Sequence, residues 1–181
     1  LEQGFRRIAF CGVSFGWSTA RAAGYDRAMR AAGFEPQDTR GFGAPPGVWP
    51  EWLGLMTGGT IGAWVASLGA PVAIVACHDY IATAILDACD RLGRSVPEDV
   101  AIVGIDNNEL RCEYSRVPLS SVDPNLEALG QRAARMLDAI LDGNAPAERT
   151  ATVAPKGVAV RRSSEWLAFG DETVNAALRF I

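Results

Sequence analysis

The stretch DVAIVGIDNNE, residues 99–109, decides how the fold of this chain is interpreted. Its apolar run, residues 100–103, is followed by a glycine and then by Asp106 and Asn107. A short apolar run bounded by turn residues is typical of a strand buried on both faces, as in a parallel sheet. The tetrapeptide Val-Ala-Ile-Val begins at residue 72 and again at residue 100, 28 residues later, which fits one β-α-β unit. The sequence therefore predicts an α/β fold, an open parallel sheet with helices on both faces.

Strand and helix signals alternate outward from this stretch. The expected strands cover residues 6–12, 72–77, 100–103 and 119–123, and residues 150–161 are expected to be extended. Residues 36–50 are rich in Gly and Pro and are expected to form a loop with room for one short strand. The expected helices cover residues 18–32, 51–69, 79–93, 107–112 and 124–142, and a further helix begins at 171–181. Ser18 is the expected N-cap of the first helix. Gly33 and Gly93 are expected to end two helices, because glycine readily adopts the left-handed conformation found there.

Composition excludes several classes of protein. Hydrophobic residues make up 49% of the 181 residues, which suits a packed core and excludes a disordered chain. The net charge of −4 gives no basic footprint for nucleic acid, and no apolar run approaches the roughly 20 residues of a membrane span. Cys11, Cys77, Cys89 and Cys112 show no C-x-x-C spacing, and the chain has one histidine. We therefore expect buried free thiols, no metal, no cofactor and no membrane partner.

Polar and aromatic residues follow three of the predicted strands at the point where each strand ends. They are Ser14, Trp17 and Arg21 after the first, His78 and Asp79 after the second, and Asp106, Asn107 and Asn108 after the third. Ligands bind beyond the carboxyl ends of the strands in open parallel sheets. We therefore expect these side chains to converge on one edge of the sheet.

The residue types at this edge suit a small polyol. Carboxylate, amide and guanidinium groups form paired hydrogen bonds with adjacent hydroxyls, and an aromatic ring covers the apolar C–H face of a sugar. The predicted sugar-binding set is Trp17, Arg21, His78, Asp79, Asp106 and Asn107.

Each of these residues also has an ordinary structural interpretation, which stays open at this point. Trp17 could pack in the core and Arg21 could be a solvated helix charge. His78 could cap or pack against a loop. Asp79 could cap the helix that follows it, and Asp106 could cap the next short helix.

A second interpretation starts from the string Gly12-Val-Ser14-Phe-Gly16, a G-x-S-x-G pattern between a strand and a helix. This is the context of an esterase nucleophile, which needs a histidine base. His78 is the one histidine, and it follows the serine without the usual chain order of acid and base. The phosphate-binding patterns G-x-G-x-x-G and G-x-x-x-x-G-K-[ST] do not occur, so nucleotide binding is not indicated.

Several segments resemble a known family. They are RRIAFCG at 6–12, the pattern R-x-x-G-Y-x-x-A-x-x-x-A-G at 21–33, VACHDYIA at 75–82, VPEDVAIVGIDNNE at 96–109 and PLSSVDPNLEALGQRAARMLDAIL at 118–141. Together they look like the sugar-sensing core of the Lac-repressor and galactose-repressor type, over about residues 4–163. That core is related to periplasmic sugar-binding proteins of type I.

Two further segments, 105–122 and 158–168, are similar to the xylose operon regulators, which carry this core ahead of an AraC-type DNA-binding domain. The resemblance implies four parts. They are most of a C-terminal lobe (1–122), a crossover and one helix of the N-terminal lobe (123–149), a return strand (150–163), and a linker that begins the DNA-binding domain (164–181). With only part of the N-terminal lobe present, the 124–142 helix would expose an apolar face formed by Leu126, Leu129, Met136, Leu137 and Ile140.

The resemblance also implies residue roles. Arg21 falls on the effector-binding arginine of the family and Asp106 on its sugar-binding aspartate. His78 stands where many members have asparagine, and Asp123 falls near another effector contact and the hinge. Trp17 is added on chemical grounds alone.

The implied function is that of a cytoplasmic, homodimeric transcription regulator rather than an enzyme. A sugar, xylose above all, closes the two lobes and changes binding to operator DNA through a further domain. A periplasmic sugar carrier of the same fold and an esterase using Ser14 remain the alternatives.

Overall fold

The computed structural model describes residues 5–36, 40–42, 59–144 and 150–165, and its centre is one six-stranded sheet. The strand order is β2-β1-β3-β4-β5-β6. The strands are β1 (Ile8–Val13), β2 (Arg40–Phe42), β3 (Val72–Ala76), β4 (Val100–Ile105), β5 (Ser120–Asp123) and β6 (Gly157–Ala159). The first five pair in parallel, whereas β6 pairs with β5 in the antiparallel direction. The predicted α/β class is confirmed, with one antiparallel edge strand in an otherwise parallel sheet.

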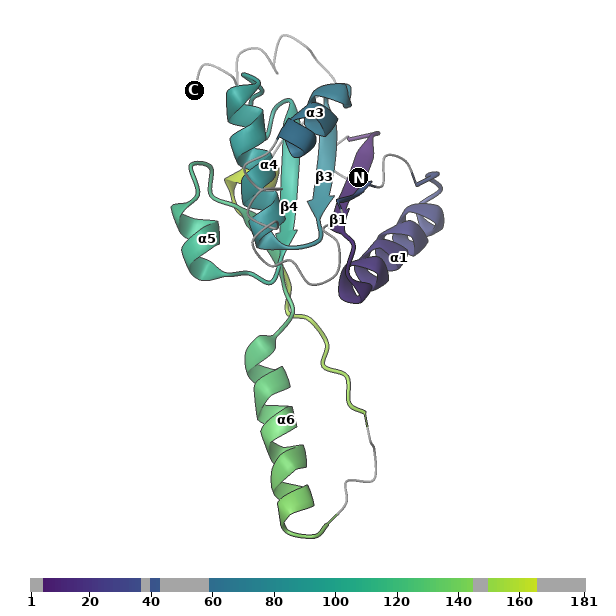
Figure 1. Cartoon of the computed structure of the whole chain (residues 1–181), viewed down its shortest axis with the longest axis vertical. Coiled ribbons are helices and arrows are strands. Elements are labelled where there is room, and N and C mark those ends of the chain that lie inside the picture. Colours follow the sequence, from purple (N-terminus) through teal and green to yellow (C-terminus); the bar gives the residue numbers. More distant parts are fainter. Residues whose placement is uncertain (1–4, 37–39, 43–58, 145–149, 166–181) are drawn as a thin grey trace.

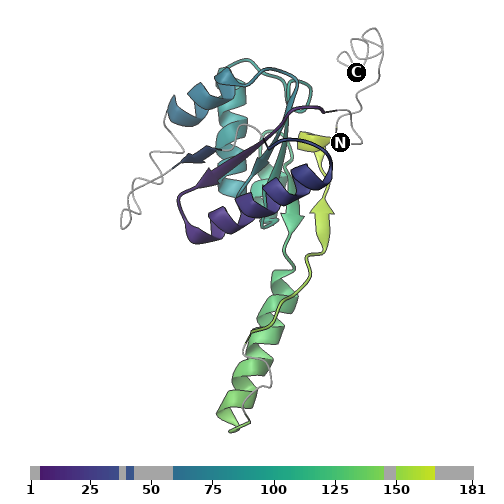
Figure 2. The same ribbon diagram turned by 90° about the vertical axis from the view of Figure 1, so that its right-hand side faces the viewer.

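Helices cover both faces of this sheet, as predicted (Figures 1 and 2). The helices are α1 (Gly16–Ala31), α3 (Gly59–Ser67), α4 (Asp79–Arg91), α5 (Glu109–Tyr114) and α6 (Leu126–Leu141), followed by a short 3-10 turn at Arg162–Ser164. The connection from β1 to β2 leads toward one edge of the sheet, and the connections from β2 to β3 and from β3 to β4 lead toward the other edge. Since parallel crossovers are right-handed, α1 lies on one face while α3 and α4 lie on the other.

The repeated tetrapeptide forms the centre of the sheet. The two copies of Val-Ala-Ile-Val are neighbours, and their residues pair one with one, from Val72 with Val100 to Val75 with Val103. Ile74 and Ile102 are both fully buried and belong to the same core. Continuous apolar strands were expected because both faces are covered, and the pairing shows that the repeat forms the two middle strands of the sheet.

Helix ends agree with the sequence where glycine sets them and differ where a polar cap was expected. Gly33 and Gly93 follow helices with φ of +79° and +67°, as predicted. Ser18 is not an N-cap, because α1 begins two residues earlier, and the Ser18 hydroxyl instead accepts a hydrogen bond from Val13 N at 2.9 Å. The short helix α5 is capped by the side chain of Asn108, so Asp106 has no capping role. Residues 51–58 and the helix expected at 171–181 lie outside the described residues.

The helix α6 stands away from the sheet, joined to it by the segments that leave β5 and return to β6 (Figure 1). None of its residues is buried. As expected, its apolar side chains form an uncovered face: Leu126, Leu129, Leu137 and Ile140 are exposed, and Met136 is half-buried. We call these five residues the α6 apolar face.

The four cysteines are free and buried, as predicted. Burial raises the pKa of Cys89 to about 11 and that of Cys112 to about 12, so both thiols stay protonated near neutral pH and are poor nucleophiles. Among the described residues, no helix is both long and apolar enough to cross a bilayer. Within the same part of the chain, no group of three or more His, Cys, Asp or Glu side chains could hold a metal ion.

The α6 apolar face generates a prediction about this chain studied by itself. Replacing Leu129 and Leu137 by Glu should reduce self-association, because an exposed apolar patch promotes contact between copies. The free energy of unfolding should change by less than about 0.5 kcal/mol, since neither side chain is buried. Sedimentation velocity and urea denaturation measure the two effects. As a control, Ile102→Ala should destabilise the fold by about 2–5 kcal/mol. Unchanged self-association of the double variant would contradict the prediction.

Candidate functional site

Asp106 is the centre of the candidate site, at the carboxyl end of β4. Its Oδ1 accepts a hydrogen bond from Arg21 Nη2 at 2.9 Å, and its Oδ2 lies 3.0 Å from His78 Nε2. The second terminal nitrogen of Arg21 donates to the carbonyl of Cys77 at the end of β3. All three side chains of this cluster are about a quarter exposed. Groups from α1, β3 and β4 therefore meet at one edge, as the sequence pattern predicts.

The backbone that carries Asp106 is strained. Asp106 has φ of +112° and Asn107 has φ of +49°, although neither residue is glycine. Such conformations cost on the order of 1–3 kcal/mol each and persist only where surrounding contacts impose them. Asp106 N donates to the carbonyl of Val122 at 3.0 Å, and Asn107 N donates to Ser121 Oγ at 3.0 Å. A strained turn held from the neighbouring strand β5 thus presents the carboxylate, which explains why an apolar strand ends in acidic and amide residues.

Hydrogen bonds fix the orientation and the tautomer of the His78 ring. Its Nδ1 accepts a hydrogen bond from Tyr80 N at 3.1 Å and caps the start of α4, so the proton of the neutral ring lies on Nε2. That Nε2–H is directed at Asp106. Burial lowers the pKa of His78, and the Asp106 carboxylate acts in the opposite direction without overcoming it. His78 is therefore a neutral hydrogen-bond donor to Asp106. It also caps α4, which is the structural role that the sequence left open.

Trp17 forms an aromatic wall beside the cluster and is not a core residue. Its side chain is 41% exposed and is stacked on Phe15, with ring centroids 6.1 Å apart and an interplanar angle of 8°. The Arg21 guanidinium lies 5.1 Å from the Trp17 ring centroid, and the His78 ring lies 5.9 Å from it. The core-packing interpretation of Trp17 is therefore wrong, and an apolar face adjoins the charged groups.

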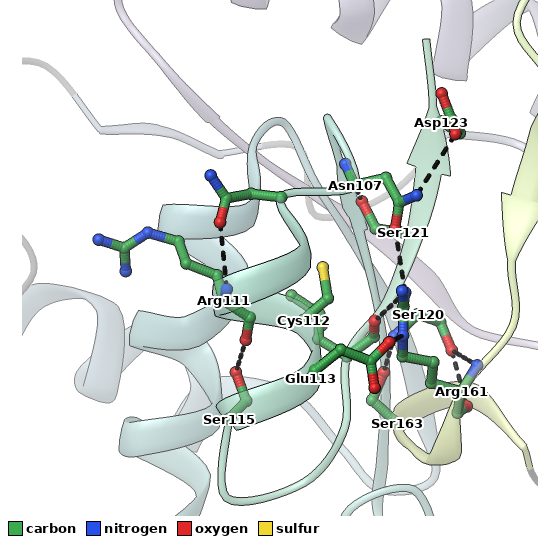
Figure 3. Close-up of polar contacts among 12 residues, drawn as sticks. Asn107, Arg111, Cys112, Glu113, Ser115, Ser120, Ser121, Asp123, Arg161 and Ser163 are labelled. Carbon is green, nitrogen blue, oxygen red and sulfur yellow. Dashed lines mark hydrogen bonds and ion pairs between the residues drawn. The ribbon is translucent and has the colours of Figure 1, made fainter. Parts of the chain in front are cut away.

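Asn107 and Asp123 lie in a second group of polar contacts (Figure 3). Asn107 Nδ2 donates to Asp123 Oδ2 at 3.4 Å, while Asn107 Oδ1 accepts from Arg161 Nη1 at 3.1 Å. Arg161 also donates to the carbonyl of Leu119 at 3.0 Å and pairs with Glu113 at 2.6 Å. The sequence pattern did not single out Arg161. The one signal that could have done so is the pair of arginines, 161 and 162, at the end of the extended segment.

Asp79 was expected to contact the ligand, but the structure places its side chain inside the protein. Its side chain is fully buried, and both oxygens have partners inside the protein. It is not the N-cap of α4 either, since His78 has that place. The structure therefore gives Asp79 a supporting position behind the site.

Ser14 does not join a catalytic arrangement with the histidine. The residue is exposed after the end of β1, but the two ring nitrogens of His78 are directed at Tyr80 and Asp106. An esterase serine needs the base within hydrogen-bond reach. The esterase interpretation thus has no geometric support at this edge.

The side chains of the Asp106 cluster are partly exposed at the carboxyl edge of the sheet. A surface cavity of about 670 Å³ lies elsewhere, between α4 and α5, where Arg94, Glu98 and Tyr114 are among its lining residues. None of the residues around Asp106 lines that cavity.

Known proteins share both the sequence pattern and the fold. The profile of the periplasmic binding protein-like domain family matches residues 1–164. The Xylose operon regulatory protein of Escherichia coli (strain K12) is 30% identical in an alignment of 184 residues, which covers 99% of this chain and 46% of that protein. A solved structure of the xylose-binding transcription activator xylR has a TM-score of 0.77 at 28% identity, covering 99% of this chain and 47% of that one.

A dimeric Lac repressor has a TM-score of 0.74 at 20% identity, covering 92% of this chain and 58% of that one, and shows the fold alone. The chain thus spans about half the length of the curated relatives and solved structures that it matches.

The environment of His78 generates a prediction about pH. Because folding lowers this pKa, the unfolded chain binds more protons at this residue, and the stability contributed by neutral His78 is lost as the pH falls below about 6.5. His78→Asn removes the titrating group and keeps a side-chain oxygen for the helix cap. The loss of thermal stability from about pH 7.5 to about pH 5.5 should be smaller in the variant, as followed by circular dichroism. An equal loss in both proteins would count against this assignment.

Proposed function

Because the chain belongs to the periplasmic binding protein-like domain family, we propose that it is the effector-sensing part of a sugar-responsive transcription regulator. The two relatives reported above that cover 99% of this chain are regulators named for xylose. A pentose, with xylose first, is therefore the proposed effector.

The observation that carries this proposal is the Asp106 carboxylate, fixed between Arg21 and His78 beside the exposed Trp17 ring. Carboxylate and guanidinium groups form charge-assisted hydrogen bonds with hydroxyls, each contributing about 1.5–3 kcal/mol. The Trp17 ring gives the C–H face of the sugar an apolar surface. We assign direct ligand contact to Trp17, Arg21, His78 and Asp106, and contact at the hinge side to Asn107 and Asp123.

The open edge would be one wall of a cleft between two lobes. In this proposal residues 1–122 form most of the C-terminal lobe, and residues 123–149 cross to the other lobe, where the rest of the protein covers the α6 apolar face. Residues 150–163 return to the first lobe. A sugar that contacts both walls favours the closed form only through its higher affinity for that form. Moving a 1:99 equilibrium to 99:1 takes about 5.5 kcal/mol, which a few charge-assisted hydrogen bonds in a dry cleft supply.

Closure would change binding to operator DNA. We propose that residues 164–181 lead into an AraC-type DNA-binding domain and that the complete protein acts in the cytoplasm as a homodimer. DNA is then contacted by the further domain, which suits the acidic sensor with its net charge of −4.

The first test removes the central carboxylate. Asp106→Ala in the complete protein should abolish pentose binding in a calorimetric titration, because it takes away the acceptor that Arg21 and His78 orient. The fold should persist, since this side chain is partly exposed. Asp87→Ala, an exposed aspartate on α4, is the matched control and should bind as the parent does. Parent-like affinity in the Asp106 variant would refute the proposed site.

The second test concerns the guanidinium. Arg21→Ala should weaken pentose binding at least tenfold, about 1.4 kcal/mol, because Arg21 orients Asp106 and offers further N–H donors to the ligand. Arg27→Ala changes an exposed arginine of the same helix and should leave the dissociation constant unchanged. Equal dissociation constants for the Arg21 variant and the parent would argue against a ligand contact at this position.

A further inference from the structure

Asp79 is a charged side chain that the proposed site does not use, and it is fully buried. A buried carboxylate is unfavourable unless hydrogen bonds satisfy its oxygens. We propose that Asp79 is a positioning residue: it clamps the turn at residues 106–108 and so holds the Asp106 carboxylate in place without touching the ligand. The inference rests on the proposed function of that turn as the effector site.

The contacts of Asp79 all lead to this turn and the elements beside it. Oδ2 accepts a hydrogen bond from Asn108 N at 2.8 Å, and Oδ1 accepts one from the Ser121 hydroxyl at 2.6 Å. The Ser121 oxygen in turn accepts from Asn107 N at 3.0 Å. One carboxylate therefore fixes two consecutive backbone amides, one directly and one through a serine. The Cys112 thiol of α5 adds a longer contact to Oδ2 at 3.6 Å.

One of these two amides belongs to the strained residue Asn107, and the other belongs to Asn108, the residue that follows it. Asp106 and Asn107 have positive φ, so the turn would relax toward ordinary backbone angles if its amide partners were lost. The third amide of the turn, Asp106 N, is held separately by the carbonyl of Val122 at 3.0 Å. Removing the Asp79 carboxylate would leave Asn108 N without its partner and Ser121 without the contact that orients its hydroxyl, so fewer contacts would impose the unusual geometry and the Asp106 side chain would no longer be aimed at Arg21 and His78.

Gly104 provides a second observation that the clamp is built into the sheet. A Cβ atom at residue 104 would lie 2.2 Å from Asp79 Oδ1, far inside van der Waals contact. Gly104 is buried in β4 and its φ is not in the left-handed region. The glycine is therefore required by the close approach of the carboxylate and not by its backbone angles.

The test compares two buried serines in the complete protein. Ser121→Ala removes one hydrogen bond to Asp79 and one from Asn107 N. Ser163→Ala is the matched control, because Ser163 is equally buried and also donates one hydrogen bond and accepts one, with Ile102 and Ser120 as partners. Asp79→Asn is the third variant. Amide hydrogen exchange of residues 106–108 without ligand, and the dissociation constant for D-xylose, are measured for each.

We expect Ser121→Ala and Asp79→Asn to raise exchange in the turn at least tenfold and to weaken xylose binding at least tenfold. Ser163→Ala should lower the melting temperature while leaving both quantities within twofold of the parent. Parent-like exchange and affinity in the first two variants, or an equal effect of Ser163→Ala, would overturn the proposal. If the parent itself binds neither xylose nor another pentose, the proposed function fails, and the exchange measurement still decides whether Asp79 holds the turn.

Gly104→Ala tests the same clamp from the opposite side. Its Cβ would displace the Asp79 carboxylate, so exchange at 106–108 should rise as it does in Asp79→Asn. Gly130→Ala in α6, where a Cβ meets nothing within 4 Å, is the control and should leave the turn unchanged. Parent-like exchange in a folded Gly104→Ala variant would overturn the proposal as well.

Discussion

Parallel pairing of β1, β3 and β4 in one register is the constraint on which the candidate site depends. The pairs Cys11 with Ala76 and Val75 with Val103 bring the carboxyl ends of the three strands to the same edge. Arg21 and Asp106, 85 residues apart in the chain, form a 2.9 Å contact there. A slip of one residue would move a strand end by about 3.3 Å, more than the length of that contact, so the apolar pairing in the core determines the polar geometry at the edge.

The charges of Asp106, Arg21 and His78 balance within this cluster. Asp106 carries one negative charge and Arg21 one positive charge, while His78 is neutral because burial lowers its pKa. Under the proposed function, an uncharged polyol would therefore replace water at this cluster without leaving a net charge of the cluster desolvated. The hydrogen bond from His78 Nε2 sets the orientation of the Asp106 carboxylate, and the tautomer of His78 is set by Tyr80 N.

Sequence patterns predicted the parts of this structure that depend on local signals. Apolar runs located β3 and β4, glycines located helix ends, and the polar residues after each strand located the edge. Ser18 was wrongly predicted to be an N-cap. The helix begins two residues earlier, at Gly16, and from that position the Ser18 hydroxyl accepts a hydrogen bond from Val13 N of β1.

Asp79 and Arg161 were misplaced or missed for a different reason. Each acts through partners 29 to 54 residues away, and sequence spacing says nothing about which way a side chain turns inside the fold. The strain at Asp106 was likewise invisible, because a positive φ at a non-glycine residue is imposed by neighbours.

The antiparallel pairing of β5 with β6 has a mechanical consequence. The chain leaves the sheet at Asp123 and re-enters at Gly157, and these two residues form the last rung of the pair. The helix α6 is thus attached to the sheet by two adjacent backbone segments. This double attachment restricts movement of α6 along the two segments and rotation about them, because either movement would stretch both segments. Movement of α6 out of the plane of the two segments only bends them. Gly157, with φ of +117°, occupies the position of this last pair where a residue bearing a side chain would be strained, and glycine adopts that conformation without the strain.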